Sequence, residues 1–135
     1  MTAPSPVIRI VVADDHQVVR TGFATLLDTQ PDFEVVGTAV DGGEAVRICR
    51  ELRPDVVLMD VRMPGMSGTE AADVLRRDHP DVPVVLLSAY NDEGIVKAAE
   101  EAHVAAYLVK GCTAEELLST VGTVINASLG RRRTE

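Results

Sequence analysis

Residues 7–15 read V-I-R-I-V-V-A-D-D, an apolar run interrupted by one arginine and closed by two aspartates. Such a nearly continuous apolar run is typical of a strand that is covered on both faces, as in a parallel sheet. Four more β-rich runs follow at 33–40, 55–60, 83–88 and 105–109. The sequence therefore predicts five strands.

Segments with helical character separate these strands, over about 16–29, 41–53, 67–78, 92–102 and 113–129. Three of them open with capping-box sequences, D-G-G-E at 41–44, S-G-T-E at 67–70 and T-A-E-E at 113–116. Asn91 is the expected cap of the weaker, alanine-rich helix over 92–102. Strands that alternate with helices through short loops require right-handed crossovers. We therefore expect a doubly wound α/β domain with one five-stranded parallel sheet and five helices.

Composition narrows the function classes. A chain of 135 residues that is 46% hydrophobic suits one domain with a proper core. The net charge of −8 argues against nonspecific nucleic-acid binding, because phosphate backbones attract basic surfaces. No apolar run approaches the roughly 20 residues of a membrane span, and no secretory signal is visible. Two cysteines do not suggest a disulfide scaffold, so a cytoplasmic location is expected.

Polar residues follow four of the predicted strands: Asp14 and Asp15, Asp60, Ser88, and Lys110. The carboxyl ends of parallel strands meet at one edge of the sheet, where ligands bind in such folds. Each carboxylate pair at about 4 Å costs on the order of 4 kcal/mol at an effective dielectric near 20. A hard cation and a lysine would neutralise the group, so the sequence predicts a site for Mg²⁺ and a phosphoryl group.

Asp60 is the best candidate for a nucleophile, because it ends the central strand and a tight loop, V-R-M-P-G-M-S-G, follows it at 61–68. Lys110 would bind phosphoryl oxygens as a point charge, and the Ser88 hydroxyl would donate to another. Taken singly, such an aspartate is usually a loop or helix cap, the serine a turn residue and the lysine solvated. The site hypothesis depends on their occurring together at successive strand ends.

These motifs resemble those of a bacterial two-component response regulator receiver domain, with similarity over about residues 7–128. The matching segments are Asp14-Asp15, D-V-V-L-M-D-V-R-M-P-G-M-S-G at 55–68, L-L-S-A at 86–89 and Y-L-V-K at 107–110. The opening V-V-A-D-D-H-Q-V-V-R-T-G-F at 11–23 resembles the NarL/FixJ branch, whose members usually carry a LuxR-type DNA-binding domain. The resemblance implies a flavodoxin-like (CheY-like) receiver fold.

By this resemblance Asp60 is the phosphoacceptor, and Asp15, Asp60 and the backbone carbonyl of Arg62 bind Mg²⁺ directly. Asp14 acts on the metal mainly through water, Lys110 contacts the phosphoryl group and Ser88 is the switch hydroxyl that moves toward it. The aromatic switch residue is Tyr107, which turns inward when the serine moves. Arg62 and Tyr90 hold positions that tune the lifetime of the phosphoryl group.

The resemblance also implies partners: a sensor histidine kinase as phosphodonor, a second copy in a homodimer after phosphorylation, and DNA through an output domain outside this chain. We expect a disordered start at 1–6, the receiver domain at 7–129 and the start of a linker at 130–135. Phosphorylation is expected to change the shape of the face made by the fourth helix, fifth strand and fifth helix. A receiver of this kind is a switch and not an enzyme that turns over an external substrate.

The chain departs from the family pattern at some positions, and its residues disfavour other function classes. His103 stands where relatives usually have glycine, which predicts a structural residue in left-handed geometry. His16 is interpreted as a loop residue and not a ligand. A stand-alone receiver that acts through protein contacts remains an alternative. A dehalogenase-like phosphatase would need a carboxylate at Arg62, and a flavodoxin-like electron carrier would need a glycine- and hydroxyl-rich loop in place of Asp14-Asp15.

Overall fold

The computed structural model describes residues 7–89 and 94–134. Five strands form one parallel sheet, and they are β1 (Ile8–Ala13), β2 (Phe33–Ala39), β3 (Val56–Asp60), β4 (Val84–Ser88) and β5 (Ala106–Val109). The helices are α1 (Gln17–Asp28), α2 (Gly42–Leu52), α3 (Gly68–Asp78), α4 (Ile95–Glu101) and α5 (Ala114–Thr134). The predicted alternation of strands and helices is confirmed, with strand limits that agree to within one residue.

The strand order is β2-β1-β3-β4-β5, so β3 is the central strand. β2 pairs with one edge of β1, and the chain then returns past β1, so that β3, β4 and β5 are added in turn at the other edge of β1. This change of direction lies between β1 and β3, where the helices that follow the two strands diverge. A crevice at the carboxyl ends of strands forms at such a point, which is where the predicted site residues lie.

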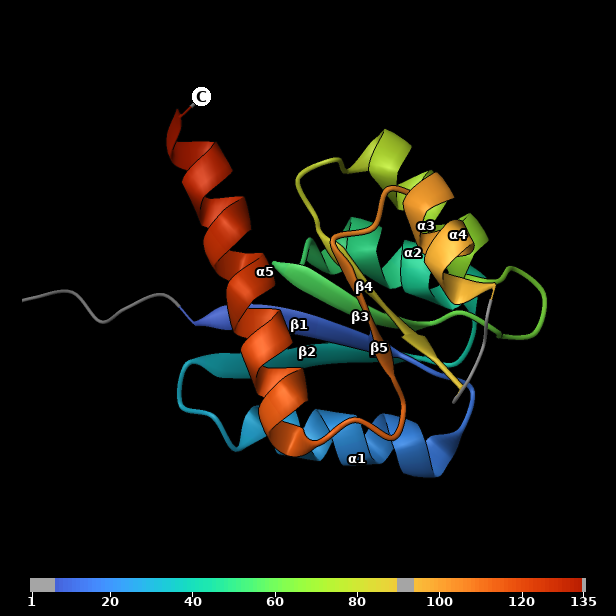
Figure 1. Cartoon of the computed structure of the whole chain (residues 1–135), viewed down its shortest axis with the longest axis horizontal. Coiled ribbons are helices and arrows are strands. Elements are labelled where there is room, and N and C mark those ends of the chain that lie inside the picture. The colour runs from blue at the N-terminus through green and yellow to red at the C-terminus, as the bar shows by residue number, and fades with distance from the viewer. Residues whose placement is uncertain (1–6, 90–93, 135) are drawn as a thin grey trace, which may run out of the picture.

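Helices cover both faces of the sheet (Figure 1). Two clusters of buried apolar side chains hold them against it. Successive residues of a strand point to opposite faces, so Val57 and Met59 of β3 pack with α2, α3 and α4, while Leu58 packs with α1 and α5. All five residues of β3 are buried, and so are all five of β4. Burial on both faces explains why these strands read as unbroken apolar runs.

Side-chain caps start three of the helices as predicted. The carboxylate of Asp41 accepts from the backbone N–H of Glu44 at 2.8 Å and begins α2. At α3, Ser67 and Glu70 form a complete reciprocal capping box, and at α5 the Thr113 hydroxyl accepts from the N–H of Glu116 at 3.1 Å. The start of α4 is Ile95, and its expected cap, Asn91, lies outside the described residues.

The last helix is longer than the sequence predicted. We expected it to end at Leu129 and a linker to begin at Gly130, but α5 continues to Thr134. One glycine inside a helix costs only about 1 kcal/mol relative to alanine. The arginines that follow are good helix formers, and no proline stops the helix. The division at residue 129 was therefore wrong for the secondary structure.

One smaller expectation is confirmed. His103 has a φ of 54° and so adopts the left-handed geometry that its place in the pattern predicted, whereas the φ of 48° at Arg53 was not foreseen. Cys49 is buried in α2, and Cys112 is a half-buried, unpaired cysteine in the loop before α5. Within the part of the chain that the structure describes, no helix is long and apolar enough to cross a membrane.

Candidate functional site

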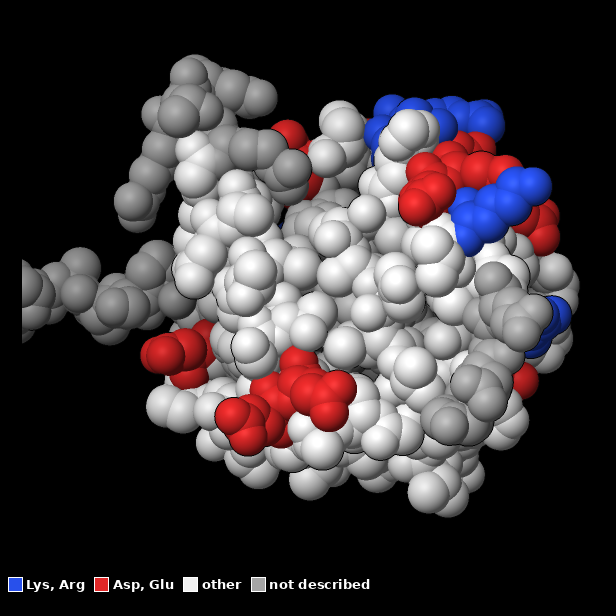
Figure 2. Space-filling view, viewed as in Figure 1, with Lys and Arg blue, Asp and Glu red and all other residues white. Residues whose placement is uncertain are grey.

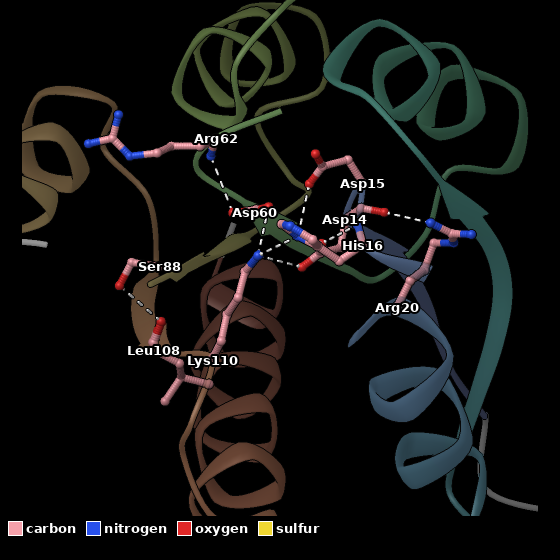
Figure 3. A network of polar contacts seen from close by, with 9 residues as sticks. All are labelled: Asp14, Asp15, His16, Arg20, Asp60, Arg62, Ser88, Leu108 and Lys110. Atoms are coloured by element: carbon pink, nitrogen blue, oxygen red, sulfur yellow. Dashed lines mark hydrogen bonds and ion pairs between the residues drawn. The ribbon is translucent and has the colours of Figure 1, made fainter. Parts of the chain in front are cut away.

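The carboxyl ends of β1, β3, β4 and β5 bring the predicted polar residues to one edge of the sheet (Figure 3). Asp14 directly follows β1, Asp60 is the last residue of β3, Ser88 is the last of β4 and Lys110 directly follows β5. Backbone pairing aligns the ends of neighbouring strands. At β4 and β5, for example, the Lys110 N–H donates to the Ser88 carbonyl at 2.8 Å. The structure therefore confirms that these residues lie at one edge.

Lys110 joins the two buried carboxylates of the site. Its Nζ lies 2.9 Å from Oδ2 of Asp60 and 3.1 Å from Oδ2 of Asp14. Asp14 is fully buried, Asp60 is 3% exposed, and the lysine side chain is 18% exposed. Two carboxylates out of contact with water need a counter-charge, because an unpaired buried charge is strongly destabilising. The ammonium group supplies it.

The remaining carboxylate oxygens are only partly satisfied. Oδ1 of Asp14 accepts from the backbone N–H of His16 at 2.8 Å, and Oδ1 of Asp60 accepts from the N–H of Arg62 at 3.2 Å. Oδ2 of Asp14 is buried and forms an ion pair with the Lys110 ammonium at 3.1 Å. A carboxylate oxygen has two lone pairs, so these oxygens can contact a cation in addition to their present partners.

The charges of the site shift its ionisation. Burial raises the pKa of Asp60 and the charge of Asp14 adds to this effect, while the hydrogen bonds from Lys110 and Arg62 act in the opposite direction. Burial alone would lower the pKa of Lys110, but its contacts with the two aspartates outweigh burial and raise it. The lysine is therefore cationic, whereas for Asp60 burial and the neighbouring charge of Asp14 outweigh the effect of Lys110.

His16 is part of this cluster, a position that its interpretation from the sequence did not predict. It does lie in the loop, as the N-terminal cap position of α1. Its Nδ1, however, is 3.2 Å from a carboxylate oxygen of Asp14, 3.2 Å from one of Asp15, and 3.3 Å from Nζ of Lys110. Side-chain direction is not encoded in a loop sequence, so spacing alone gave no signal for it.

Two other contributors were missed. The guanidinium of Arg20, one turn into α1, donates to the backbone carbonyl of Asp14 at 2.8 Å and fixes the end of β1. A Cβ on Gly68 would lie 1.9 Å from the carbonyl oxygen of Asp60, so only glycine fits there. The Gly68 N–H also donates to the Val61 carbonyl at 2.8 Å, which folds the loop 61–68 back under the site. The glycine in the quoted loop motif was the available signal.

The predicted switch residues lie beside the charged cluster but do not contact it. The Ser88 hydroxyl is turned toward the Leu108 carbonyl, at a long 3.5 Å, and not toward Asp60 (Figure 3). Tyr107, on β5, is 44% exposed to solvent. Of the two predicted tuning positions, Arg62 adjoins Asp60 through its backbone, and Tyr90 lies outside the described residues.

The cluster is suited to a divalent cation. One ligand atom from each of Asp14, Asp15, His16 and Asp60 can be chosen so that all four lie within 4.8 Å of one another. Carboxylate oxygens are the ligands that Mg²⁺ prefers, and it needs few of them because it keeps several waters. Two buried carboxylates share the single ammonium of Lys110, so the site keeps a negative charge that a cation would neutralise. The residues present therefore fit Mg²⁺.

Known proteins share this arrangement of sequence and fold. A family model described as the response regulator receiver domain matches residues 10–122. The transcriptional regulatory protein LiaR of Bacillus subtilis is 42% identical over 114 residues, which cover 84% of this chain and 54% of that protein. The oxygen regulatory protein NreC of Staphylococcus haemolyticus is 42% identical over 118 residues, covering 87% and 54%. The chain thus spans about half the length of these curated relatives.

Solved structures agree with both the fold and the branch. The receiver domain of the putative response regulator NarL from Mycobacterium tuberculosis has a TM-score of 0.82 at 35% identity, covering 93% of this chain and 98% of that one. A LuxR-family two-component response regulator from Aurantimonas sp. has a TM-score of 0.84 at 29% identity, covering 96% and 99%. The resemblance to the NarL/FixJ branch and the CheY-like fold are therefore confirmed. The chain belongs to the response regulator receiver domain family.

Proposed function

We propose that this chain is a phosphorylation switch in which Asp60 accepts a phosphoryl group from a sensor histidine kinase, with Mg²⁺ bound by the acidic cluster. The observation that carries the proposal is the Lys110 ammonium between two buried carboxylates, 2.9 Å from Asp60 and 3.1 Å from Asp14. Receiver domains are in general phosphorylated on aspartate and bind Mg²⁺, and this chain supplies the matching residues at the matching strand ends.

In the transfer, a carboxylate oxygen of Asp60 forms a bond to phosphorus while the bond from phosphorus to the kinase's histidine nitrogen breaks. The released electron pair stays on that nitrogen, which regains a proton. Asp14, Asp15, Asp60 and the Arg62 carbonyl are the groups that would hold Mg²⁺, with Asp14 acting mainly through water. The metal, when bound, supplies positive charge that stabilises the phosphoryl oxygens.

Each residue of the chain has a separate task in this step. Lys110 already faces Asp60, and its ammonium would pair with a phosphoryl oxygen once the carboxylate is phosphorylated. The Arg62 N–H holds the other oxygen of Asp60 and fixes its rotamer. Arg62 and Tyr90 also border the site in the sequence, and we propose that their side chains shield the acyl phosphate from water. Positioning and charge are what phosphoryl transfer chiefly requires.

The switch then depends on two side chains that are not yet engaged. A phosphoryl group adds charge and acceptor oxygens next to Ser88, whose present hydrogen bond to Leu108 is long and weak. We propose that Ser88 turns toward the phosphoryl group and that the exposed ring of Tyr107 moves into the space it leaves. The arrangement with an outward Tyr107 is then the unphosphorylated one.

The output face is the one formed by α4, β5 and α5. Its exposed apolar residues include Val96 on α4 and Tyr107 on β5. Figure 2 shows the area over β5 and α5 as largely uncharged, with acidic and basic groups gathered toward its edges. We propose that phosphorylation reshapes this face and promotes a homodimer, and that a LuxR-type output domain acts on DNA. A cytoplasmic location and the absence of turnover on an external substrate belong to the same proposal.

Phosphorylation by a small-molecule donor tests the function without the kinase. The purified chain is incubated with acetyl phosphate and Mg²⁺, and its intact mass is followed. We expect one phosphoryl group on the wild type, none with EDTA and none on Asp60→Asn. The control Asp32→Asn should also gain one, because Asp32 lies at the amino-terminal ends of β1 and β2, at the opposite edge of the sheet from the site. Equal labelling of Asp60→Asn and wild type would contradict the assignment.

A further inference from the structure

The loop 61–68 between β3 and α3 includes Arg62, whose carbonyl is one of the proposed metal ligands. Backbone hydrogen bonds hold the two ends of this loop. The Val61 N–H donates to the Leu87 carbonyl of β4 at 2.9 Å, and the Gly68 N–H donates to the Val61 carbonyl at 2.8 Å. Because Mg²⁺ requires nearly ideal ligand geometry, the middle of the loop has to be held as well.

Gly42, the first residue of α2, contacts the loop between these two ends. Its N–H donates to the carbonyl of Met66 at 3.2 Å. A Cβ on Gly42 would lie 2.9 Å from the carbonyl carbon of Met66 and closer still to its oxygen. Backbone atoms cannot turn aside as the end of a side chain can, so the helix and the loop would have to separate by about 1 Å. Only glycine therefore allows α2 to begin so close to the loop.

The segment before Gly42 is connected to the other half of the acidic cluster. The N–H of Asp14 donates to the carbonyl of Ala39, the last residue of β2, at 3.0 Å. Two residues separate Ala39 from Gly42, and the second of them, Asp41, caps α2 with its carboxylate. Residues 39–42 thus contact the backbone of the cluster at one end and the loop after β3 at the other.

We infer that Gly42 is a positioning residue for phosphoryl transfer: by holding the Met66 carbonyl, it sets the path of the loop that brings the Arg62 carbonyl to Mg²⁺. The inference rests on the proposed metal site and adds to it the residue that fixes one of the ligands. The neighbouring Gly43 does not share this role, because it is exposed and a Cβ there would meet only an oxygen of Asp41, at 3.5 Å. The D-G-G-E sequence does not distinguish the two glycines, whereas the structure does.

Mg²⁺ binding measured without a phosphodonor tests this inference. The variant is Gly42→Ala, and Gly43→Ala is its matched control at the next position of the same helix. A second control, Gly37→Ala on β2, perturbs stability away from the loop, because its Cβ would press on the side chains of Ile48 and Leu52. For each protein, the Mg²⁺ dissociation constant is measured from amide chemical shifts, and the stability is measured from the urea midpoint in EDTA.

We expect Gly42→Ala to weaken Mg²⁺ binding about tenfold, the lower end of what outer-shell partners of metal ligands contribute. Gly43→Ala and Gly37→Ala should change the constant less than about twofold. An unchanged constant in folded Gly42→Ala would overturn the inference, and so would an equal weakening in Gly37→Ala at a similar loss of stability. If the wild type itself binds no Mg²⁺, the metal site of the proposed function fails and the inference fails with it.

Hydrogen exchange in the wild type is a second measurement, and it decides the question if Gly42→Ala does not fold. A contact that favours metal binding must itself be favoured by the bound metal, because coupling is reciprocal. Saturating Mg²⁺ should therefore slow exchange of the Gly42 amide about fivefold more than that of the Arg53 amide, which donates to the Cys49 carbonyl at the other end of α2. Equal slowing of the two amides would indicate general stabilisation only and would contradict the inference.

Discussion

Replacing Lys110 by methionine is the most informative test of how the site is held together. The substitution keeps the length of the side chain and removes the charge that lies 2.9 Å from Asp60 and 3.1 Å from Asp14. Removing one partner of a buried ion pair costs about 3–5 kcal/mol. Because the lysine is 18% exposed and water can partly replace it, we expect the lower end, about 3 kcal/mol.

Urea unfolding followed by circular dichroism, in EDTA at pH 7, measures this loss. With a slope near 2 kcal/mol per molar urea, the midpoint should fall by about 1.5 M. The matched control is Lys97→Met, which removes the chain's other lysine from an exposed position on α4 and should shift the midpoint little. Excess Mg²⁺ should restore most of the stability of Lys110→Met, because a bound divalent ion neutralises the same carboxylates.

The double variant Lys110→Met/Asp60→Asn separates repulsion from lost packing. If the destabilisation comes from unpaired carboxylates, removing one of them should recover at least half of the loss. A loss below about 1 kcal/mol in the single variant would contradict the counter-charge account, since buried pairs cost more than this when broken. So would a double variant no more stable than Lys110→Met, which would show that the lysine stem and not its charge matters.

Three further outcomes follow from the structure and can be measured on the same protein. Gly68→Ala should lower the free energy of unfolding by about 1–3 kcal/mol, because its Cβ would meet the Asp60 carbonyl. Gly122→Ala, in open space inside α5, should raise the free energy of unfolding by about 1 kcal/mol. Urea midpoints of the two variants measure both changes. Because the pKa of Asp60 is higher in the folded than in the unfolded protein, its protonated form stabilises the fold at pH values below the unfolded pKa. This stabilisation is lost as the pH rises through the folded pKa. In a profile of unfolding free energy against pH, measured in EDTA, Asp60→Asn should remove the decrease over this range. Burial raises the pKa of Cys49 to about 12, so a thiol reagent at pH 8 should modify Cys112 first and reach Cys49 only on unfolding.

The strand ends were predictable because their geometry follows from topology alone. Once the sequence indicates parallel strands, Asp14, Asp60, Ser88 and Lys110 must meet at one edge, whatever their rotamers. The helix caps at Ser67 and Thr113 were predictable for a related reason, since a cap depends on residues three apart in sequence.

The missed features depend on contacts that are distant in sequence or on side-chain direction. His16 was interpreted as a plain loop residue, and only the folded loop shows its ring among the carboxylates. The need for glycine at Gly68 arises from the approach of α3 to the carbonyl of Asp60. The helical stretch after Leu129 was missed because residues 130–135 were interpreted as the start of a linker, although the arginines there favour a helix.

The central claim is that the phosphoryl group is carried by Asp60, and locating it on the chain is the most direct test. After reaction with acetyl phosphate and Mg²⁺, borohydride reduces an aspartyl phosphate to homoserine, and peptide mapping then identifies the modified residue. The account predicts homoserine at position 60 and at no other aspartate, and none when Mg²⁺ is removed. Homoserine at Asp14 or Asp15, or an unmodified Asp60 in a chain that has gained phosphate, would contradict it.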